Sequence, residues 1–205
     1  GGFSDTVASL TFNSQGGYND GGPRFWTGAG TLTLTGGITA TSVDDIRAMA
    51  LFQGNLALAS STTVTVDKVA GTTLSGTRGD ANEQAGLAIN ANISGGTTLV
   101  KAGLGALQFS VVSTSLAAIN VNAGSLIVGA SANLPNARIT LAANTILDLR
   151  GQTGLAVGSV ASSAASAVIK NFSLSTAGTL VTGADGTDAT FAGVLVSDYT
   201  SGQLN

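Results

Sequence analysis

The 205-residue chain contains no cysteine and no histidine, and it has only two prolines and a single glutamate, Glu83. The lack of cysteine excludes a disulfide scaffold and a thiolate metal site. The lack of histidine removes the most common general base and the usual transition-metal ligand. A Ser-His-Asp hydrolase therefore cannot be built from these residues, and we expect no metal site and no cofactor.

Charge is also scarce, because only 9% of the residues are charged and the formal net charge is −3. The eight lysines and arginines are dispersed from Arg24 to Lys170 and form no basic patch. A surface of this kind does not favour the phosphate backbone, so we expect no nucleic-acid partner. No apolar run reaches the length of a membrane span, so we also expect no membrane span in this chain.

Small and β-branched residues take the place of the missing types. The chain has 29 glycines and is 43% hydrophobic, although aromatic residues make up only 5%. Threonine and valine are abundant and favour pleated surfaces. Between Leu99 and Leu149, short runs alternate between apolar and polar residues, and glycine, asparagine and serine separate the runs. This pattern predicts short strands joined by turns.

The spacing of these runs adds a repeat. Leu107, Leu126, Leu147 and Val168 are the centres of strong runs, and the steps between them are 19, 21 and 21 residues. A nearly constant step is typical of stacked coils that share one core. We predict an all-β fold, a right-handed parallel β-helix (β-solenoid) with coils of about twenty residues, in which Leu107, Leu126 and Leu147 face inward. A β-sandwich or β-barrel is the alternative.

The same alternation predicts strands along the rest of the chain. Outside 99–149 they are expected at 7–12, 30–34, 38–40, 54–58, 62–66, 72–74, 87–93, 154–160, 167–169, 172–174, 179–181 and 191–196. Residues 42–52 are the one helix-like segment, because Ser42 is a suitable cap and acidic residues follow it. The alternative is that 46–58 forms strands.

Two runs carry a family resemblance. Residues 99–107 (LVKAGLGAL) and 119–129 (INVNAGSLIVG) resemble the autotransporter-associated β-strand repeat, which favours L-x-K-x-G-x-G-x-L-x-L followed by T-x-V-N-A-G-x-L-x-V-G. Weaker copies occur at 27–36 and 54–59. The resemblance implies a β-helix displayed on a bacterial surface or secreted, and it implies no particular activity because such repeats are scaffold.

The ends of the sequence lead to an expectation about its context. The chain opens on Gly1, Gly2 and Phe3 without a charged-then-apolar leader segment. Residues 199–205 stop where another copy of the first motif would begin. We expect residues 1–205 to be a single β-solenoid segment of a longer or processed surface protein, located outside the cell or on a bacterial cell surface.

Two segments are candidates for a contact surface. Arg24, Phe25 and Trp26 include the only tryptophan, which suits an exposed site for a sugar or a protein; the alternative, which we favour, is a cap over the open end of the solenoid. The polar segment 76–86 contains Arg78, Gly79 and Asp80, a tripeptide by which matrix proteins engage integrins. The same residues are common in plain turns, which is the simpler interpretation.

Evidence for catalysis is weak. Asp44 and Asp45 suggest a comparison with polysaccharide-active β-helix enzymes, but no second acidic cluster accompanies them. Residues 183–188 (GADGTD) resemble one copy of a glycine- and aspartate-rich calcium repeat, yet a single copy lacks the register of stacked repeats, so we predict a turn. We therefore expect no enzyme and no catalytic residues.

Our leading hypothesis is a structural extracellular β-solenoid that is displayed as a rigid rod or assembles into a filament or sheath. We expect self-association, either lateral or end to end. The alternatives are an adhesin-like module that binds host proteins or surface glycans, and a polysaccharide-active enzyme.

Overall fold

The computed structural model describes residues 2, 4–14, 22–42, 49–59, 61–67, 85–96, 98–130, 132–173 and 176–197. Strands dominate these residues, and no helix is found among them. The strands are β1 (Asp5–Val7), β2 (Leu10–Ser14), β3 (Arg24–Leu34), β4 (Ile38–Ser42), β5 (Ala50–Leu58), β6 (Thr62–Val66), β7 (Ala85–Gly95), β8 (Thr98–Ala102), β9 (Ala106–Phe109), β10 (Ala118–Val121), β11 (Ser125–Val128), β12 (Leu134–Leu141), β13 (Ile146–Asp148), β14 (Leu155–Ala161), β15 (Val168–Asn171), β16 (Leu180–Val181) and β17 (Val194–Ser197).

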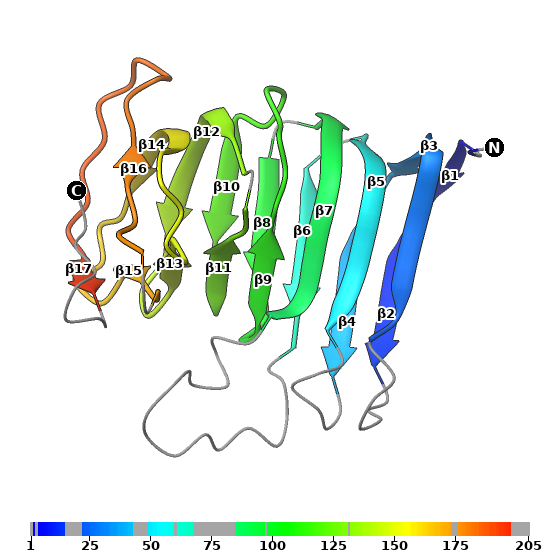
Figure 1. Cartoon of the computed structure of the whole chain (residues 1–205), viewed down its shortest axis with the longest axis horizontal. Helices are drawn as coiled ribbons and strands as arrows, with labels where there is room; N and C mark the ends of the chain where they lie inside the picture. Colours follow the sequence, from blue (N-terminus) through cyan, green and yellow to red (C-terminus); the bar gives the residue numbers. More distant parts are fainter. Residues whose placement is uncertain are drawn as a thin grey trace.

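The strands form two parallel sheets between which the chain alternates. The odd-numbered strands form a nine-stranded sheet in the order β1-β3-β5-β7-β9-β11-β13-β15-β17, which we call the odd sheet. The even-numbered strands form the eight-stranded even sheet, from β2 to β16. The two sheets run side by side, and the termini lie at opposite ends of the row (Figure 1). Because sandwiches and up-and-down barrels are antiparallel, this all-parallel arrangement is instead consistent with a β-solenoid.

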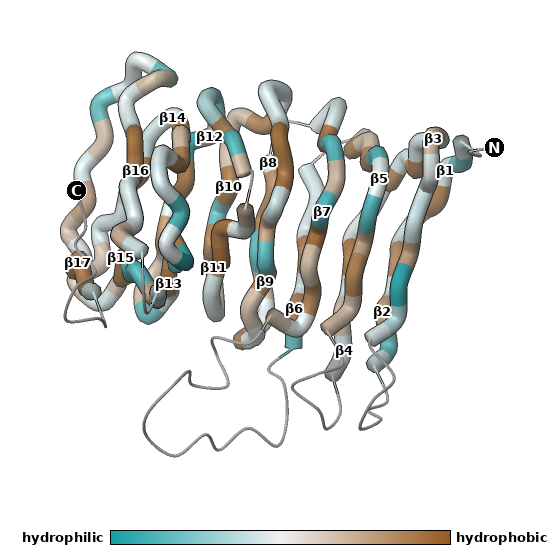
Figure 2. The backbone as a smooth tube through the Cα atoms, viewed as in Figure 1, coloured by the Kyte–Doolittle hydropathy of each residue, from teal (hydrophilic) through white to brown (hydrophobic). Residues whose placement is uncertain are grey.

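A column of aliphatic side chains runs through the core. In the odd sheet Leu87 pairs with Leu107, Leu107 with Leu126, Leu126 with Leu147, and Leu147 with Ile169. All five side chains are buried. Period-two alternation turns these residues to the inner face, and parallel pairing stacks them. Hydrophobic segments recur from strand to strand along the row (Figure 2).

The predicted burial of Leu107, Leu126 and Leu147 is confirmed. Val168, the fourth predicted centre of the repeat, was wrong by one residue. Leu147 pairs with Ile169, whereas Val168 pairs with Ile146 and is only half-buried. A shift of one residue moves a side chain to the other face of a strand. Strands 62–66, 106–109 and 125–128 match the prediction at both ends.

Other expected elements need correction. The single first strand at 7–12 is replaced by β1 and β2, which belong to different sheets because the chain turns between Val7 and Leu10. The helix at 42–52 is wrong where it is described, since Ser42 ends β4 and Ala50 begins β5. Residues 43–48 of that helix, and the strand expected at 72–74, lie outside the described residues. Residues 172–173 are not in a strand.

The two ends of the odd sheet are incomplete in different places. At the N-terminal end, β1 pairs only with Leu32–Leu34 of β3, so the described structure provides no strand beside Arg24–Trp26 on that side. At the C-terminal end, β17 pairs with β15 and has no described strand on its other side. None of the described segments is a helix with the length and apolarity to cross a membrane.

Candidate functional site

The first half of β3 places three predicted contact residues side by side. Phe25 faces inward and stacks on Phe52 of β5, with ring centroids 5.4 Å apart and ring planes 13° from parallel. Its neighbours Arg24 and Trp26 are exposed, and Trp26 has 75% of its surface accessible. Alternation along the strand explains this opposition, because consecutive side chains point to opposite faces.

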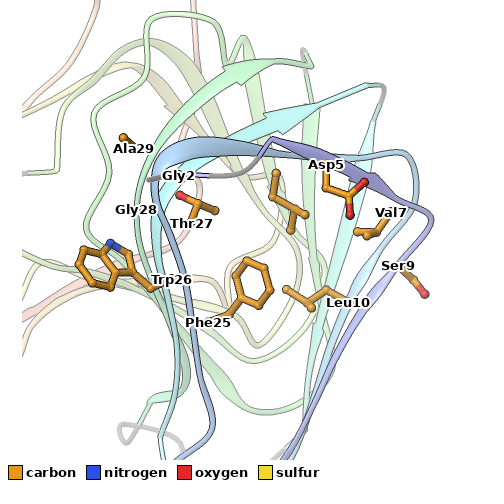
Figure 3. A pocket seen from close by; sticks show the side chains of 11 residues that line it. Gly2, Asp5, Val7, Ser9, Leu10, Phe25, Trp26, Thr27, Gly28 and Ala29 are labelled. Carbon is orange, nitrogen blue, oxygen red and sulfur yellow. The ribbon is translucent and has the colours of Figure 1, made fainter.

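Phe25 lies in a hollow at the open end of the stack. The hollow has a volume of about 730 Å³. Figure 3 shows Phe25, Leu10 and Val7 pointing into the space between the sheets, whereas Trp26, which also lines the hollow, lies on the opposite side of β3 from Phe25. Asp5 pairs in register with the buried Leu32 and lines the same hollow, so this mostly apolar end carries one carboxylate. The hollow could take an apolar side chain or a flat ring.

A bulge in β3 separates Arg24–Trp26 from Leu32–Leu34, the part of the strand that pairs with β1. Trp26 pairs with Gln53 and Thr31 with Asn55, so several residues of β3 oppose one glycine, Gly54, which has φ 111°. The hydroxyl of Thr27 accepts a hydrogen bond from the Asn55 backbone N–H at 2.9 Å. The Asn55 side chain in turn donates to the Gly30 carbonyl at 3.0 Å. The side chains therefore hold the bulge in place where the ladder is interrupted.

Of the predicted contact residues, the structure brings Arg24, Phe25 and Trp26 together and leaves Trp26 accessible. The favoured interpretation of this segment as a cap over the open end stays a prediction, because Trp26 lines the hollow at that end but has an exposed ring. Arg78, Gly79 and Asp80 lie outside the described residues. Asp44 and Asp45, which carried the enzyme alternative, do so as well.

A buried lysine was missed by the prediction. Lys101 pairs with Val64 and Val121 in the even sheet and has no accessible surface. Its Nζ donates hydrogen bonds to the carbonyl oxygens of Ala102 (2.8 Å), Gly103 (2.8 Å) and Ala123 (3.0 Å). Burial lowers the Lys101 pKa from 10.5 to about 8, since desolvation disfavours the charged amine. Its two-residue spacing from Leu99 was the available signal, because residues i and i+2 share a face.

The glycines that follow Lys101 belong to the same corner. Gly103 has φ 76°, and a Cβ there would collide with the carbonyl oxygen of Val66 in the preceding circuit of the chain. A Cβ on Gly105 would collide with Asp67, and one on Gly124 would collide with Gly105. The K-x-G-x-G run and the glycine at 124 therefore form a corner where successive circuits touch backbone to backbone.

A second polar cluster surrounds the buried Asp148. Its Oδ2 accepts a hydrogen bond from Arg150 Nε at 2.8 Å, and its Oδ1 accepts from the backbone N–H groups of Arg150 (2.9 Å) and Phe172 (3.1 Å). Lys170 Nζ lies 4.8 Å from the Phe172 ring centroid. The carboxylate thus fixes the turn after β13, where Arg150 has φ 48°, and ties it to the next circuit. Asp148 therefore has a structural role, and its charge is paired with that of Arg150.

Residues 183–188 form the turn predicted for them. The Ser159 hydroxyl donates to Asp185 Oδ2 at 2.6 Å, and the Thr187 N–H donates to Oδ1 at 3.1 Å. The Ser159 hydrogen bond, together with those of Thr187, lowers the Asp185 pKa below its ordinary value. In the described part of the chain, no three acidic residues gather closely enough to hold a metal ion.

Comparison with known proteins adds no assignment. No family model, no curated protein and no solved structure matches this chain.

Proposed function

We propose that this chain is a non-catalytic structural protein, a rigid β-solenoid located outside the cell or on a bacterial cell surface, which associates with copies of itself into a filament or sheath. We further propose a right-handed solenoid with coils of about twenty residues over 99–149. The kinship with autotransporter-associated repeats is part of this proposal, and it rests on the two motifs at 99–107 and 119–129.

One observation carries the proposal: the unbroken inner column from Leu87 to Ile169. Each circuit of chain buries its apolar face against its neighbours, which produces an extended rod. The polar clusters support the same role, because Lys101 donates three hydrogen bonds to backbone carbonyl groups and Asp148 accepts two from backbone N–H groups. Rigidity and length are the properties that such an arrangement provides.

Electron microscopy with light scattering on the same purified chain tests this function. We expect elongated particles or fibres, and fibre diffraction with the strand spacing of about 4.8 Å along the long axis. Discrete compact monomers at every concentration would contradict self-assembly. Turnover of any member of a polysaccharide panel would contradict the non-catalytic assignment.

A binding module is the second candidate, and the exposure of Trp26 favours it. An accessible indole beside an apolar hollow is suited to stacking on a sugar ring or a protein side chain. Titration with soluble glycans, followed by Trp26 emission, tests this candidate. A saturable change that Trp26→Ala abolishes would support the binding module, whereas unchanged emission across the glycan panel would count against it.

A further inference from the structure

We infer that two copies of this chain join end to end by strand addition: β17 of one copy pairs in parallel with the open edge of β3, at Arg24–Trp26, of the next. The inference rests on the proposed self-assembly and names its contact. The first support is the incomplete edge of the odd sheet at its N-terminal end. There β1 pairs only with Leu32–Leu34, and the described structure provides no strand beside Arg24–Trp26.

At this open edge, the backbone groups of Arg24 and Trp26 face the side on which a second copy would add its strand. The Leu51 N–H donates to the Pro23 carbonyl at 2.9 Å, which shows that Pro23 faces β5. Because backbone groups alternate sides along a parallel strand, Phe25 also faces β5, and the N–H and C=O of Arg24 and Trp26 face the vacant side. No described strand pairs with these groups, and an edge of this kind is a template for another strand.

The matching strand is at the C-terminal end. The Val194 N–H donates to the Ala167 carbonyl at 2.8 Å, so the backbone groups of Val194 and Val196 face β15, and those of Leu195 face away from the stack. Strand β17 reads Val-Leu-Val-Ser, so it presents no charged side chain that would oppose pairing.

The register follows from the column of paired residues that begins at Arg24. This column passes through Leu51, Ala88, Gln108, Ile127, Asp148 and Lys170 and ends at Val196. One more step of the same kind places Val196 of a second copy opposite Arg24. The Arg24 N–H then donates to the carbonyl of the second copy's Leu195.

The exposed apolar side chains support this register. Leu195 pairs with Ile169 and therefore continues the inner leucine column, yet 63% of its surface is accessible. Phe25 borders the hollow of about 730 Å³ at the other end. End-to-end docking covers both with the kind of packing that the core already uses. Because the two contacting surfaces differ, the contact is head to tail, and its repetition along the row of strands generates an open filament.

Single-cysteine variants test the register directly, because the chain has no cysteine of its own. Arg24→Cys and Val196→Cys chains of distinguishable mass are mixed and treated with a short bismaleimide. We expect the mixed product to exceed both same-variant products by at least tenfold. Thr63→Cys, on the exposed face of β6, is the matched control and should give no enriched product with Val196→Cys. Dominant same-variant products, or equal linking of Thr63→Cys, would overturn the inference.

A second pair of variants keeps the test independent of cross-linking. Arg24→Pro removes the N–H that faces the vacant side while the Pro23–Leu51 bond remains possible, and Arg24→Ala keeps that N–H. By sedimentation velocity, we expect Arg24→Pro to weaken association at least tenfold and Arg24→Ala to associate like the parent, with equal circular dichroism. Equal association of both variants would overturn the inference. Filaments without the Arg24–Val196 link would leave the proposed function intact, whereas a strictly monomeric parent would overturn both.

Discussion

Lys101 donates a hydrogen bond from its Nζ to the carbonyl oxygen of Ala123, 3.0 Å away and one circuit further along the chain. The bond joins the two halves of the repeat motif, because Lys101 belongs to the first run and Ala123 to the second. It also places an amine where the neighbouring positions of the column, Val64 and Val121, are aliphatic. Lys101 therefore links two successive circuits of the chain inside the stack.

The buried amine makes stability depend on pH in the alkaline range. Because burial lowers the Lys101 pKa from 10.5 to about 8, the unfolded chain holds the proton more tightly between those values. The free energy of unfolding of the parent, relative to Lys101→Met, should therefore rise by about 3 kcal/mol as the pH increases from 8 to 10.5 and stay constant below 8. Denaturant unfolding of both proteins measures this difference. If the difference in free energy of unfolding does not change with pH, the hydrogen bonds to the three carbonyl oxygens offset the effect of burial on the Lys101 pKa.

Substitution of the central leucine should disrupt the stack. Leu126 lies between Leu107 and Leu147 in the inner column. Leu126→Asp places an unpaired carboxyl there and should lower the free energy of unfolding by at least about 3 kcal/mol. Thr140→Asp, on the exposed face of β12, is the control and should change it by no more than about 0.5 kcal/mol. Equal unfolding midpoints for the two variants would show that Leu126 is not a core residue.

Alanine substitutions at two glycines should distinguish the cost of backbone strain from the cost of a steric collision. Gly103 and Gly154 both have positive φ, 76° and 79°, but a Cβ meets the Val66 carbonyl only at Gly103. Gly154→Ala should cost about 1 kcal/mol from the left-handed conformation alone. Gly103→Ala should cost at least about 1 kcal/mol more, because neighbouring circuits must separate. Thermal unfolding distinguishes the two, and equal losses would contradict the close approach at the corner.

The turn at Asp185 should respond to a single hydroxyl. Because the Ser159 hydroxyl stabilises the charged carboxylate, Ser159→Ala should raise the Asp185 pKa toward its ordinary value, and Ser159→Thr should leave it low. The lowered pKa stabilises the fold at pH values above the ordinary 3.8 and this contribution is lost as the pH falls through the folded value. Carboxyl NMR titration measures the shift. An unchanged pKa in Ser159→Ala would assign the effect to Thr187.

The two neighbouring aromatic residues should behave differently. In dilute solution, Trp26 emission should be red-shifted and readily quenched, because 75% of its surface is accessible. Trp26→Ala should change the free energy of unfolding by no more than about 0.5 kcal/mol. Phe25→Ala, which removes the stack on Phe52, should cost about 1–2 kcal/mol. Blue, protected emission from Trp26 would contradict its orientation.

Much of the fold could be predicted from local patterns, and the failures share one cause. Alternation located the strands at 62–66, 106–109 and 125–128, because face preference is encoded every second residue. The helix predicted at 42–52 was wrong at both described ends, because Ser42 belongs to β4 and Ala50 to β5. Ala50 pairs with Leu87, a partner far away in the sequence that a local pattern does not reveal. For the candidate contact site, the sequence named Arg24, Phe25 and Trp26, and only the structure shows that Phe25 stacks on Phe52 while Trp26 is exposed.

The sequence by itself determined an all-β chain, the short alternating strands and the inward leucines Leu107, Leu126 and Leu147, because these depend on neighbours two residues apart. The tertiary structure alone decided that Lys101 lies inside the stack, that β1 pairs only with the last three residues of β3, and that Trp26 points away from the core. These features depend on register between segments twenty or more residues apart, such as Asp5 with Leu32 and Lys101 with Ala123. A local pattern fixes the face of a strand, and only the partner strand fixes what lies opposite it.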